Sequence, residues 1–329
     1  MSVRNPFDGQ KVLITGGKGF IGSHLAEKLL NLGAYVTILD AGRQNSGSND
    51  ANIADIRDSI EFIHGDLRAY ETVLKALRGQ DVVFHTAAQV SRIESIKRPI
   101  EDIEINCVGT MNVLLAAKEA TDTPRVVFTS SRAVYGTPTE VPVTEASDVK
   151  PVDVYGTNKL AAELYCEIYD GDGLSSVVAR PTNVYGPRAQ VHDTSYGVIN
   201  AFVRKAIEDE VLTVFEPGTM TRDCIYVSDA VNALLQLGFE GDVSGEVYNV
   251  GIGKGYTIME IAETIVDIAG SGEVELVKWP DDWTGLEIGD FVCDNSKAKR
   301  ELDWEPSVSL SEGLERTIDF YEENLEKYT

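Results

Sequence analysis

The stretch Lys11-Val-Leu-Ile-Thr-Gly-Gly-Lys-Gly-Phe-Ile-Gly22 joins a short apolar run to a glycine-rich turn. The aliphatic residues of 11–15 predict a buried strand, and the residues from Phe20 to about Leu32 predict a helix. Glycines at this spacing permit a tight turn whose backbone amides can approach an anion at the positive end of the helix. Such a turn also occurs as a plain structural turn, so its meaning depends on what surrounds it.

The alternation of short strand and helix continues beyond this stretch. Apolar and β-branched runs predict strands at 35–40, 60–64, 81–85, 125–130 and 176–179. Helical patterns are found at 70–77, 101–120, 154–169, 197–208 and 257–269. The polar run 42–49 predicts a loop. Strands that alternate with helices indicate βαβ units and a parallel sheet covered on both faces, so the predicted fold class is α/β.

Asp40 ends the second predicted strand, about 18 residues after Gly22. An acid at this place accepts hydrogen bonds from ribose hydroxyls and repels a 2′-phosphate, which favours NAD over NADP. Arg43 is close enough in the sequence to weaken that inference, although an arginine in a loop is more often an ordinary surface residue. Together, the turn and Asp40 predict nucleotide binding.

The composition sets limits on partners and location. The 329 residues include 53 acidic and 29 basic ones, which gives a formal net charge of -24. Such a surface repels nucleic acid and anionic lipid; it serves solubility or reflects adaptation to high salt. Four scattered cysteines, no signal-like start and no run of about 18 to 20 apolar residues predict a cytoplasmic protein without a membrane span. The four histidines have no ligand spacing, so no metal is predicted.

Tyr155 and Lys159 place a phenol and an ammonium one turn apart on the same face of a predicted helix. This spacing also arises by chance on amphipathic helices. Ser131 strengthens the prediction because it follows the predicted strand 125–130, and ligands of parallel sheets bind at the carboxyl ends of strands.

At this point the chain resembles the sugar-nucleotide epimerase and dehydratase branch of the extended short-chain dehydrogenase/reductase family. The resemblance runs over nearly the whole chain, and many ordered motifs carry it. Besides the glycine-rich turn and the Tyr155/Lys159 pair, they are Gly65-Asp-Leu67, His85-Thr-Ala-Ala-Gln89, Asn106-Cys-Val-Gly-Thr110, Arg180-Pro-Thr-Asn-Val-Tyr-Gly-Pro-Arg188, Arg222-Asp-Cys-Ile-Tyr-Val227, Tyr248-Asn-Val-Gly251 and the tail 296–306.

The resemblance implies a Rossmann-type doubly wound parallel sheet with a smaller, interleaved α/β substrate domain. The implied NAD-binding domain comprises residues 1–182 and 222–250, and the substrate-binding domain comprises 183–221 and 251–329. Relatives commonly dimerise through two helices of each subunit, which here correspond to about 101–120 and 154–169. A homodimer is therefore expected.

The family also implies roles for individual residues. Tyr155 would be the general base, Lys159 would lower its pKa, and Ser131 would bind the sugar oxygen and help move the proton. The residues expected beside NAD are Gly16, Gly19, Phe20, Ile21, Gly22, Asp40, Asp66, Leu67, Thr86, Ala87, Ala88, Gln89, Asn106, Tyr155, Lys159 and Thr182. A free phenol has a pKa of about 10, so a base acting near pH 7 needs a shift worth roughly 4 kcal/mol. A cation 4 to 5 Å away contributes about 3 to 4 kcal/mol.

The expected substrate is a nucleotide-diphosphate sugar, with a UDP-sugar favoured. By resemblance, Asn183, Arg188 and Arg222 face its diphosphate, because a guanidinium suits phosphate oxygens. One departure from the family pattern concerns this end. Relatives often carry Arg-x-Gly-Asp where this chain has Glu287-Ile-Gly-Asp290, so an acid stands in place of an arginine.

The residues after Ser131 narrow the reaction. Dehydratases of this branch use an Asp-Glu pair there, and decarboxylating relatives keep the Glu, whereas this chain has Arg132 and Ala133. Dehydration and decarboxylation are therefore disfavoured, and the prediction is epimerisation at C4 through a transient 4-keto sugar. The alternative is a net reductase or dehydrogenase of a 4-keto(-6-deoxy) nucleotide sugar. A third reading, a catalytically inactive NAD-sensing scaffold, is opposed by the intact Ser131, Tyr155 and Lys159.

Overall fold

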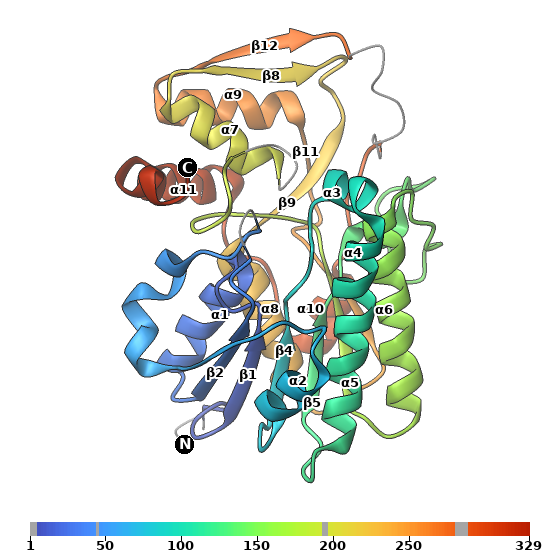
Figure 1. Ribbon diagram of the computed structural model, residues 1–329. Coiled ribbons are helices and arrows are strands. Elements are labelled where there is room, and N and C mark those ends of the chain that lie inside the picture. The colour runs from blue at the N-terminus through green and yellow to red at the C-terminus, as the bar shows by residue number, and fades with distance from the viewer. Residues whose placement is uncertain (1–4, 44–45, 193–196, 280–288) are drawn as a thin grey trace.

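The computed structural model describes residues 5–43, 46–192, 197–279 and 289–329 (Figure 1). Its centre is a seven-stranded sheet with the order β10-β6-β5-β4-β1-β2-β3. All six neighbouring pairs are parallel. The strands are β1 (Lys11–Thr15), β2 (Tyr35–Asp40), β3 (Glu61–His64), β4 (Val82–His85), β5 (Arg125–Thr129), β6 (Ser176–Pro181) and β10 (Val247–Val250).

The chain changes direction across the sheet at β1. It proceeds from β1 to β2 and β3 on one side, then crosses to β4, β5 and β6 on the other. In register, Thr15 pairs with Leu39 and with His85, so three strands end at one level. The connections after β1 and β4 leave in opposite directions, which opens a crevice at the carboxyl ends of the strands.

Side chains of β1 alternate between two hydrophobic clusters, one on each face of the sheet. Val12 and Ile14 belong to the cluster that contains α1 and α8, and Leu13 belongs to the cluster that contains α2, α5 and α6. This period of two is the geometry of a strand buried on both faces. The helices are α1 (Phe20–Asn31), α2 (Tyr70–Leu77), α5 (Gly109–Glu119), α6 (Val154–Gly171) and α8 (Val227–Phe239).

A smaller unit lies above the carboxyl ends of the strands, at the top of Figure 1. Strands β8 and β12 pair in parallel, and β9 lies between β7 and β11. Its elements are β7 (Asn183–Tyr185), α7 (Val198–Ile207), β8 (Val211–Phe215), β9 (Thr221–Tyr226), β11 (Gly255–Thr257), α9 (Ile258–Ala269), β12 (Glu273–Val277) and α11 (Leu310–Asn324). Helix α10 (Ser296–Leu302) contacts β10 of the large sheet. The division into domains at 183, 222 and 251 stays a prediction.

The structure confirms the α/β class and the Rossmann-like sheet, but it divides the helix predicted at 101–120. Three elements precede α5: α3 (Arg92–Lys97), α4 (Pro99–Ile103) and a π-helical turn, η2 (Glu104–Val108). Pro99 lacks an N–H and therefore starts α4 instead of continuing α3. The wider turn at η2 holds an extra residue, which sequence periodicity does not reveal.

His85 is fully buried and links three elements of the large unit. The Thr110 hydroxyl donates to the Asn106 carbonyl at 2.6 Å, so Thr110 accepts from Nε2 of His85 at 3.0 Å. Nδ1 of His85 then accepts from the Thr15 hydroxyl at 2.8 Å. Burial, aided by the nearby Lys159 charge, lowers the pKa of His85 to about 3. The neutral imidazole therefore ties β4 to β1 and α5.

This burial predicts a loss of stability in mild acid. The unfolded chain protonates His85 near pH 6.5, whereas the folded protein resists protonation down to about pH 3. The contribution of His85 to the free energy of unfolding is therefore fully present above pH 6.5 and is lost progressively between pH 6.5 and 3. At pH 5 the loss is about 2 kcal/mol. Burial also lowers the pKa of His24 to about 4, which acts in the same direction.

Urea unfolding at pH 7 and pH 5 measures this loss, and His85→Asn serves as the comparison. The variant should be less stable at pH 7 but should lose less free energy of unfolding between the two pH values. An equal loss in both proteins would contradict the assignment.

Candidate active site

The glycine-rich turn brings two loops into close backbone contact. Gly16 has a positive φ of 73°, and a Cβ there would lie 2.7 Å from Cα of Ala87. A Cβ on Gly22 would lie 2.3 Å from the carbonyl oxygen of Gly16. Helix α1 starts after Gly19 without a side-chain cap, and its first turn borders the main cavity. The amides of that turn can therefore bind an anion, such as a pyrophosphate.

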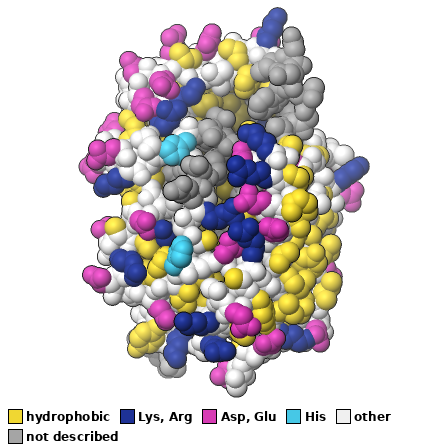
Figure 2. All heavy atoms as spheres, in the orientation of Figure 1, with side chains coloured by type: hydrophobic (Ala, Val, Ile, Leu, Met, Phe, Trp, Pro, Cys, Tyr) yellow, Lys and Arg dark blue, Asp and Glu magenta, His cyan; other side chains and the backbone are white. Residues whose placement is uncertain are grey.

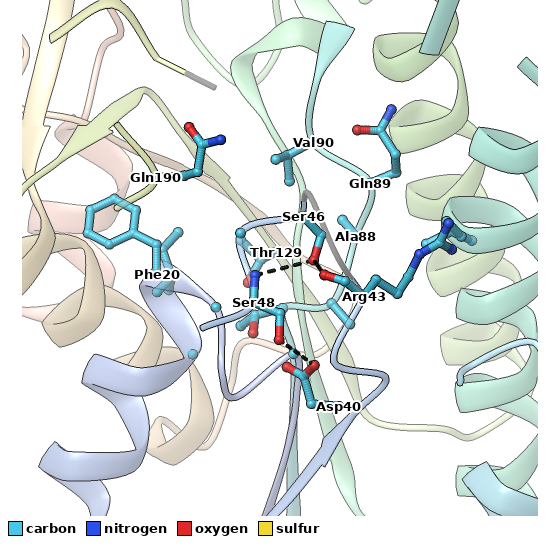
Figure 3. Close-up of a pocket in the computed structure, with 18 of the residues that line it drawn as sticks. Phe20, Asp40, Arg43, Ser46, Ser48, Ala88, Gln89, Val90, Thr129 and Gln190 are labelled. Carbon is cyan, nitrogen blue, oxygen red and sulfur yellow. Dashed lines mark hydrogen bonds between the residues drawn. The ribbon is translucent and has the colours of Figure 1, made fainter. Parts of the chain in front are cut away.

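Asp40 lies buried at the carboxyl end of β2 and accepts three hydrogen bonds. They come from the backbone N of Lys18 at 3.0 Å, the backbone N of Gly42 at 2.8 Å and the hydroxyl of Ser48 at 3.0 Å. Figure 3 shows Ser48 beside this carboxylate at the cavity wall. The two backbone donors orient the carboxylate, and the exchangeable serine hydroxyl is the partner that a ribose diol can replace.

The two nearby cations are each paired with another acid. Arg43 forms an ion pair with Glu101 of α4, and Figure 3 shows its side chain directed away from Asp40. Nζ of Lys18 lies 2.6 Å from the carboxylate of Asp50. A 2′-phosphate would therefore be repelled by the Asp40 carboxylate, and both nearby cations are already paired with other acids. This arrangement favours NAD over NADP.

A cavity of about 750 Å³ extends from Asp40 to the catalytic candidates. Figure 3 shows part of its lining around Asp40, Ala88 and Thr129. Nearly all residues predicted to contact the cofactor line it. They are Gly16, Gly19, Phe20, Ile21, Gly22, Asp40, Asp66, Leu67, Thr86, Ala87, Ala88, Gln89, Tyr155, Lys159 and Thr182. Ser131 lines it as well. The cavity thus fits an elongated dinucleotide that is bound by backbone amides at its centre and by an acid at one end.

Asn106 does not line this cavity but supports it from behind. Its Oδ1 accepts from the backbone N of Gln89 at 3.1 Å, and its Nδ2 donates to the Gln89 carbonyl at 3.0 Å. The Asn106 amide therefore fixes the backbone of a cavity-lining residue. Contact of Asn106 with the cofactor stays a prediction, and the structure adds a positioning role for its amide.

Asp102 is a buried acid that the sequence analysis missed. Its carboxylate accepts from Nε2 of Gln89 at 2.7 Å, from Nδ2 of Asn106 at 3.0 Å and from Nδ2 of Asn158 at 2.6 Å. It thereby joins α4, η2 and α6 around one charge close to Lys159. An acid within an amphipathic helix normally indicates a solvated face, so the sequence held no signal for this network.

Tyr155 and Lys159 lie in the first turns of α6, where Asp153 caps the helix by accepting from the backbone N of Gly156 at 2.7 Å. The Ser131 hydroxyl, at the carboxyl end of β5, lies close enough to the phenol to lower the pKa of Tyr155. Nζ of Lys159 donates to the Thr129 carbonyl at 2.8 Å. The three residues predicted to act together are thus adjacent and face the same cavity.

Burial dominates the protonation of this pair. It raises the pKa of Tyr155 to about 12, and the hydrogen bond from Ser131 and the charge of Arg132 act in the opposite direction. Burial lowers the pKa of Lys159 to about 8, which the charges of Asp102 and Glu163 oppose. A phenolate at pH 7 therefore needs about 7 kcal/mol of stabilisation, more than the 4 kcal/mol inferred from an unburied phenol.

The three residues predicted at the diphosphate do not line the cavity. Asn183 donates to the Asp223 carbonyl at 3.0 Å, and Arg188 pairs with Glu27 of α1 at 2.6 Å. Nη1 of Arg222 donates to the carbonyls of Thr221 and Gly289, at 2.9 and 2.5 Å. Glu287 lies outside the described residues. Diphosphate contact by these three residues stays a prediction.

Within the described ranges, no group of three or more His, Cys, Asp or Glu side chains could hold a metal ion. No helix in those ranges is long and apolar enough to cross a membrane. The four cysteines are buried free thiols.

The sequence model of the NAD dependent epimerase/dehydratase family matches residues 12–251 of this chain. The chain belongs to this family. The dependence of this family on NAD agrees with the cavity and its buried acid. Membership of the family also makes the protein an enzyme of the epimerase type.

Individual members of the epimerase/dehydratase family are similar over nearly the full chain. A UDP-glucose 4-epimerase of Mycolicibacterium smegmatis is 34% identical, covering 94% of this chain and 98% of that protein. The UDP-glucuronic acid decarboxylase 6 of Arabidopsis thaliana is 36% identical, covering 92% and 86%. The solved UDP-glucose 4-epimerase of Thermotoga maritima with UDP-glucose has a TM-score of 0.87 and 31% identity, covering 96% and 100%. Similarity alone therefore does not separate the reactions of the family.

Asp40→Asn should weaken NAD binding by about tenfold, because a charged acceptor is replaced by a neutral one. NADP binding should weaken less, because the repulsion of a 2′-phosphate also disappears. Calorimetry with both dinucleotides measures the two dissociation constants. Asp58→Asn, at an exposed acid, makes the same change of charge and should leave both values unaltered. An unchanged preference in Asp40→Asn would refute the role of this acid.

Proposed function

We propose that the protein epimerises a nucleotide-diphosphate sugar, a UDP-sugar in particular, at C4 through a transient 4-keto intermediate. The observation that carries this proposal is the adjacent set of Ser131, Tyr155 and Lys159, with Arg132 and Ala133 where the eliminating relatives place acids. The set can move a proton and support hydride transfer, but it offers no acid–base pair for loss of water.

In the proposed mechanism, Tyr155 removes the proton of the C4 hydroxyl. Ser131 binds the same oxygen and keeps the phenol in line, while the buried ammonium of Lys159 stabilises the phenolate. When bound in the cavity, NAD would accept a hydride from C4 and return it to the opposite face of the sugar, which would invert C4 with no net redox change. Its positive ring would add to the charge that favours the phenolate of Tyr155.

With a pKa of about 12, Tyr155 can act as a base near pH 7 only if binding of the ligands lowers that pKa. At pH 7 the phenol of the empty cavity is protonated, so no single nearby group accounts for catalysis. Lys159 is already in place in the empty cavity, so further stabilisation would have to come from the positive ring of bound NAD, a cation worth about 3 to 4 kcal/mol at close range. Proton removal is thereby favoured in the complex with NAD.

The test is incubation of the purified enzyme with UDP-, dTDP-, GDP- and CDP-sugars, including UDP-glucose and UDP-glucuronic acid, with NAD far below the sugar concentration. Chromatography should reveal one sugar converted to its C4 epimer in large excess over NAD. Conversion limited by the NAD present would instead indicate a net oxidoreductase. Stoichiometric NAD binding without any turnover would indicate an inactive scaffold.

Tyr155→Phe should lower kcat for the sugar that is converted by about 10²- to 10⁴-fold, because the proton acceptor is removed. NAD should remain bound, since the ring still fills its place in α6. Tyr165→Phe, on the same helix but outside the cavity lining, should keep the wild-type rate. A fully active Tyr155→Phe enzyme would refute the mechanism.

We also infer that the protein is a homodimer and that, with its free thiols, it resides in the cytoplasm. Exposed hydrophobic side chains gather on one side of the molecule, over α4 to α6 (Figure 2). They include Ile100, Ile103, Val108, Leu164 and Ile168, of which Leu164 is 50% and Ile168 64% exposed. A contiguous apolar face over helices suits burial against a second copy.

The double variant Leu164→Asp with Ile168→Asp should be monomeric, because two charges would be buried at the helix pair. Sedimentation velocity compares it with wild type and with Phe239→Asp, a charge placed on an equally exposed hydrophobic residue of α8. Phe239→Asp should sediment as a dimer. A monomeric wild-type protein would disprove the proposed assembly.

A further inference from the structure

Arg132 is a largely enclosed arginine that pairs with no acid in the part of the chain that the structure describes. Its Nε donates to Oδ1 of Asn183 at 3.1 Å, and its guanidinium lies over the ring of Phe291, 5.2 Å from the centroid. Nη1 is buried and has no hydrogen-bond partner among the described residues. No carboxylate of the described residues is within ion-pair distance of it. A buried donor without an acceptor is costly, and at a functional site it indicates a place for an oxyanion.

Two other arginines add positive charge at the same place. Arg92 of α3 is paired with Asp153, and Arg222 donates to two backbone carbonyls. Burial first, and then the charges of Arg222 and Arg92, lower the pKa of Arg132 to about 9. In a chain with a net charge of -24, three guanidinium groups near enough for two of them to act on the third are an exception to the general surface. An anion between them would relieve this repulsion.

The position of Arg132 assigns that anion to the reacting end of the sugar. Arg132 is not itself a lining residue of the cavity, but it directly follows Ser131, which lines it, and its charge acts on the phenol of Tyr155. In a nucleotide hexose, the diphosphate is attached at C1, across the ring from C4. The carbon beside C4 is C5, which carries C6. An anionic group that reaches Arg132 while the C4 hydroxyl meets Tyr155 is therefore on C6.

We propose that Arg132, with Arg92 and Arg222 around it, recognises a carboxylate at C6, so that the preferred substrate is a nucleotide-linked uronic acid. A guanidinium binds a carboxylate through two parallel N–H groups, and Nη1 provides an uncommitted donor for this contact. This inference rests on the proposed C4 epimerisation and specifies its substrate class.

The experiment compares kcat/KM for UDP-glucuronic acid and UDP-glucose in wild type, Arg132→Gln, Arg132→Lys and the control Arg300→Gln. Wild type should prefer the uronic acid. In Arg132→Gln the ratio of the two kcat/KM values should fall by at least about 100-fold, because the carboxylate loses its charged partner. Arg132→Lys should recover part of the ratio. Arg300 is 66% exposed and pairs only with Glu301 in the described structure, so its variant should keep the wild-type ratio.

Two outcomes would overturn the inference: a wild-type preference for UDP-glucose, or an equal loss for both sugars in Arg132→Gln. An equal loss would place Arg132 at the shared diphosphate or in a structural role. If neither sugar is epimerised, the proposed reaction fails, and calorimetric binding still decides the specificity. In that case wild type should bind UDP-glucuronic acid more tightly than UDP-glucose, with the difference lost in Arg132→Gln, and equal affinities would refute the recognition of a carboxylate.

Discussion

The structure depends on keeping two opposite charges out of water beside the cavity. Lys159 is 3% exposed and Asp102 is 1% exposed. Such burial is tolerated only when partners satisfy the charges. Asp102 is surrounded by three amide donors, and the Lys159 ammonium is held by the Thr129 carbonyl, so α4, η2, α6 and the end of β5 are fixed relative to one another. The rigid part of the site is thus an electrostatic arrangement, and the reacting phenol lies within it.

The sequence predicted the large sheet well because its strands are short, apolar and separated by helices. Strand bounds at 11–15 and 35–40 and the helix at 70–77 agree with the structure. Prediction failed where periodicity is interrupted without changing composition, as at the π-helical turn before α5. It also omitted α11, whose buried side is formed by residues such as Leu314 and Ile318 among many acids. The local sequence does carry a signal for that helix, because Ser309 caps it and apolar residues recur at helical spacing at 310, 314, 318 and 321.

The candidate site could be predicted where a residue acts by its own chemistry or by its backbone. The glycines, Asp40 and the Tyr155/Lys159 pair are examples, and all of them line one cavity. Residues that act through a partner were harder to predict. The sequence predicts Asn106 beside the cofactor, whereas the contacts in the structure show its amide holding the backbone of Gln89, and Arg132 was considered only for the acid that it replaces. Their roles depend on which side chains the fold brings beside them.

The ion pair between Arg43 and Glu101 joins the loop after β2 to α4, and both side chains border the adenosine end of the cavity. They are 33% and 28% exposed, so dissolved ions reach them and weaken their attraction. Ionic strength therefore acts on the tie between this loop and α4 as well as on the acidic exterior. For a chain of net charge -24, added salt screens the repulsion among the surface acids and at the same time weakens one of the contacts that hold the cavity wall together.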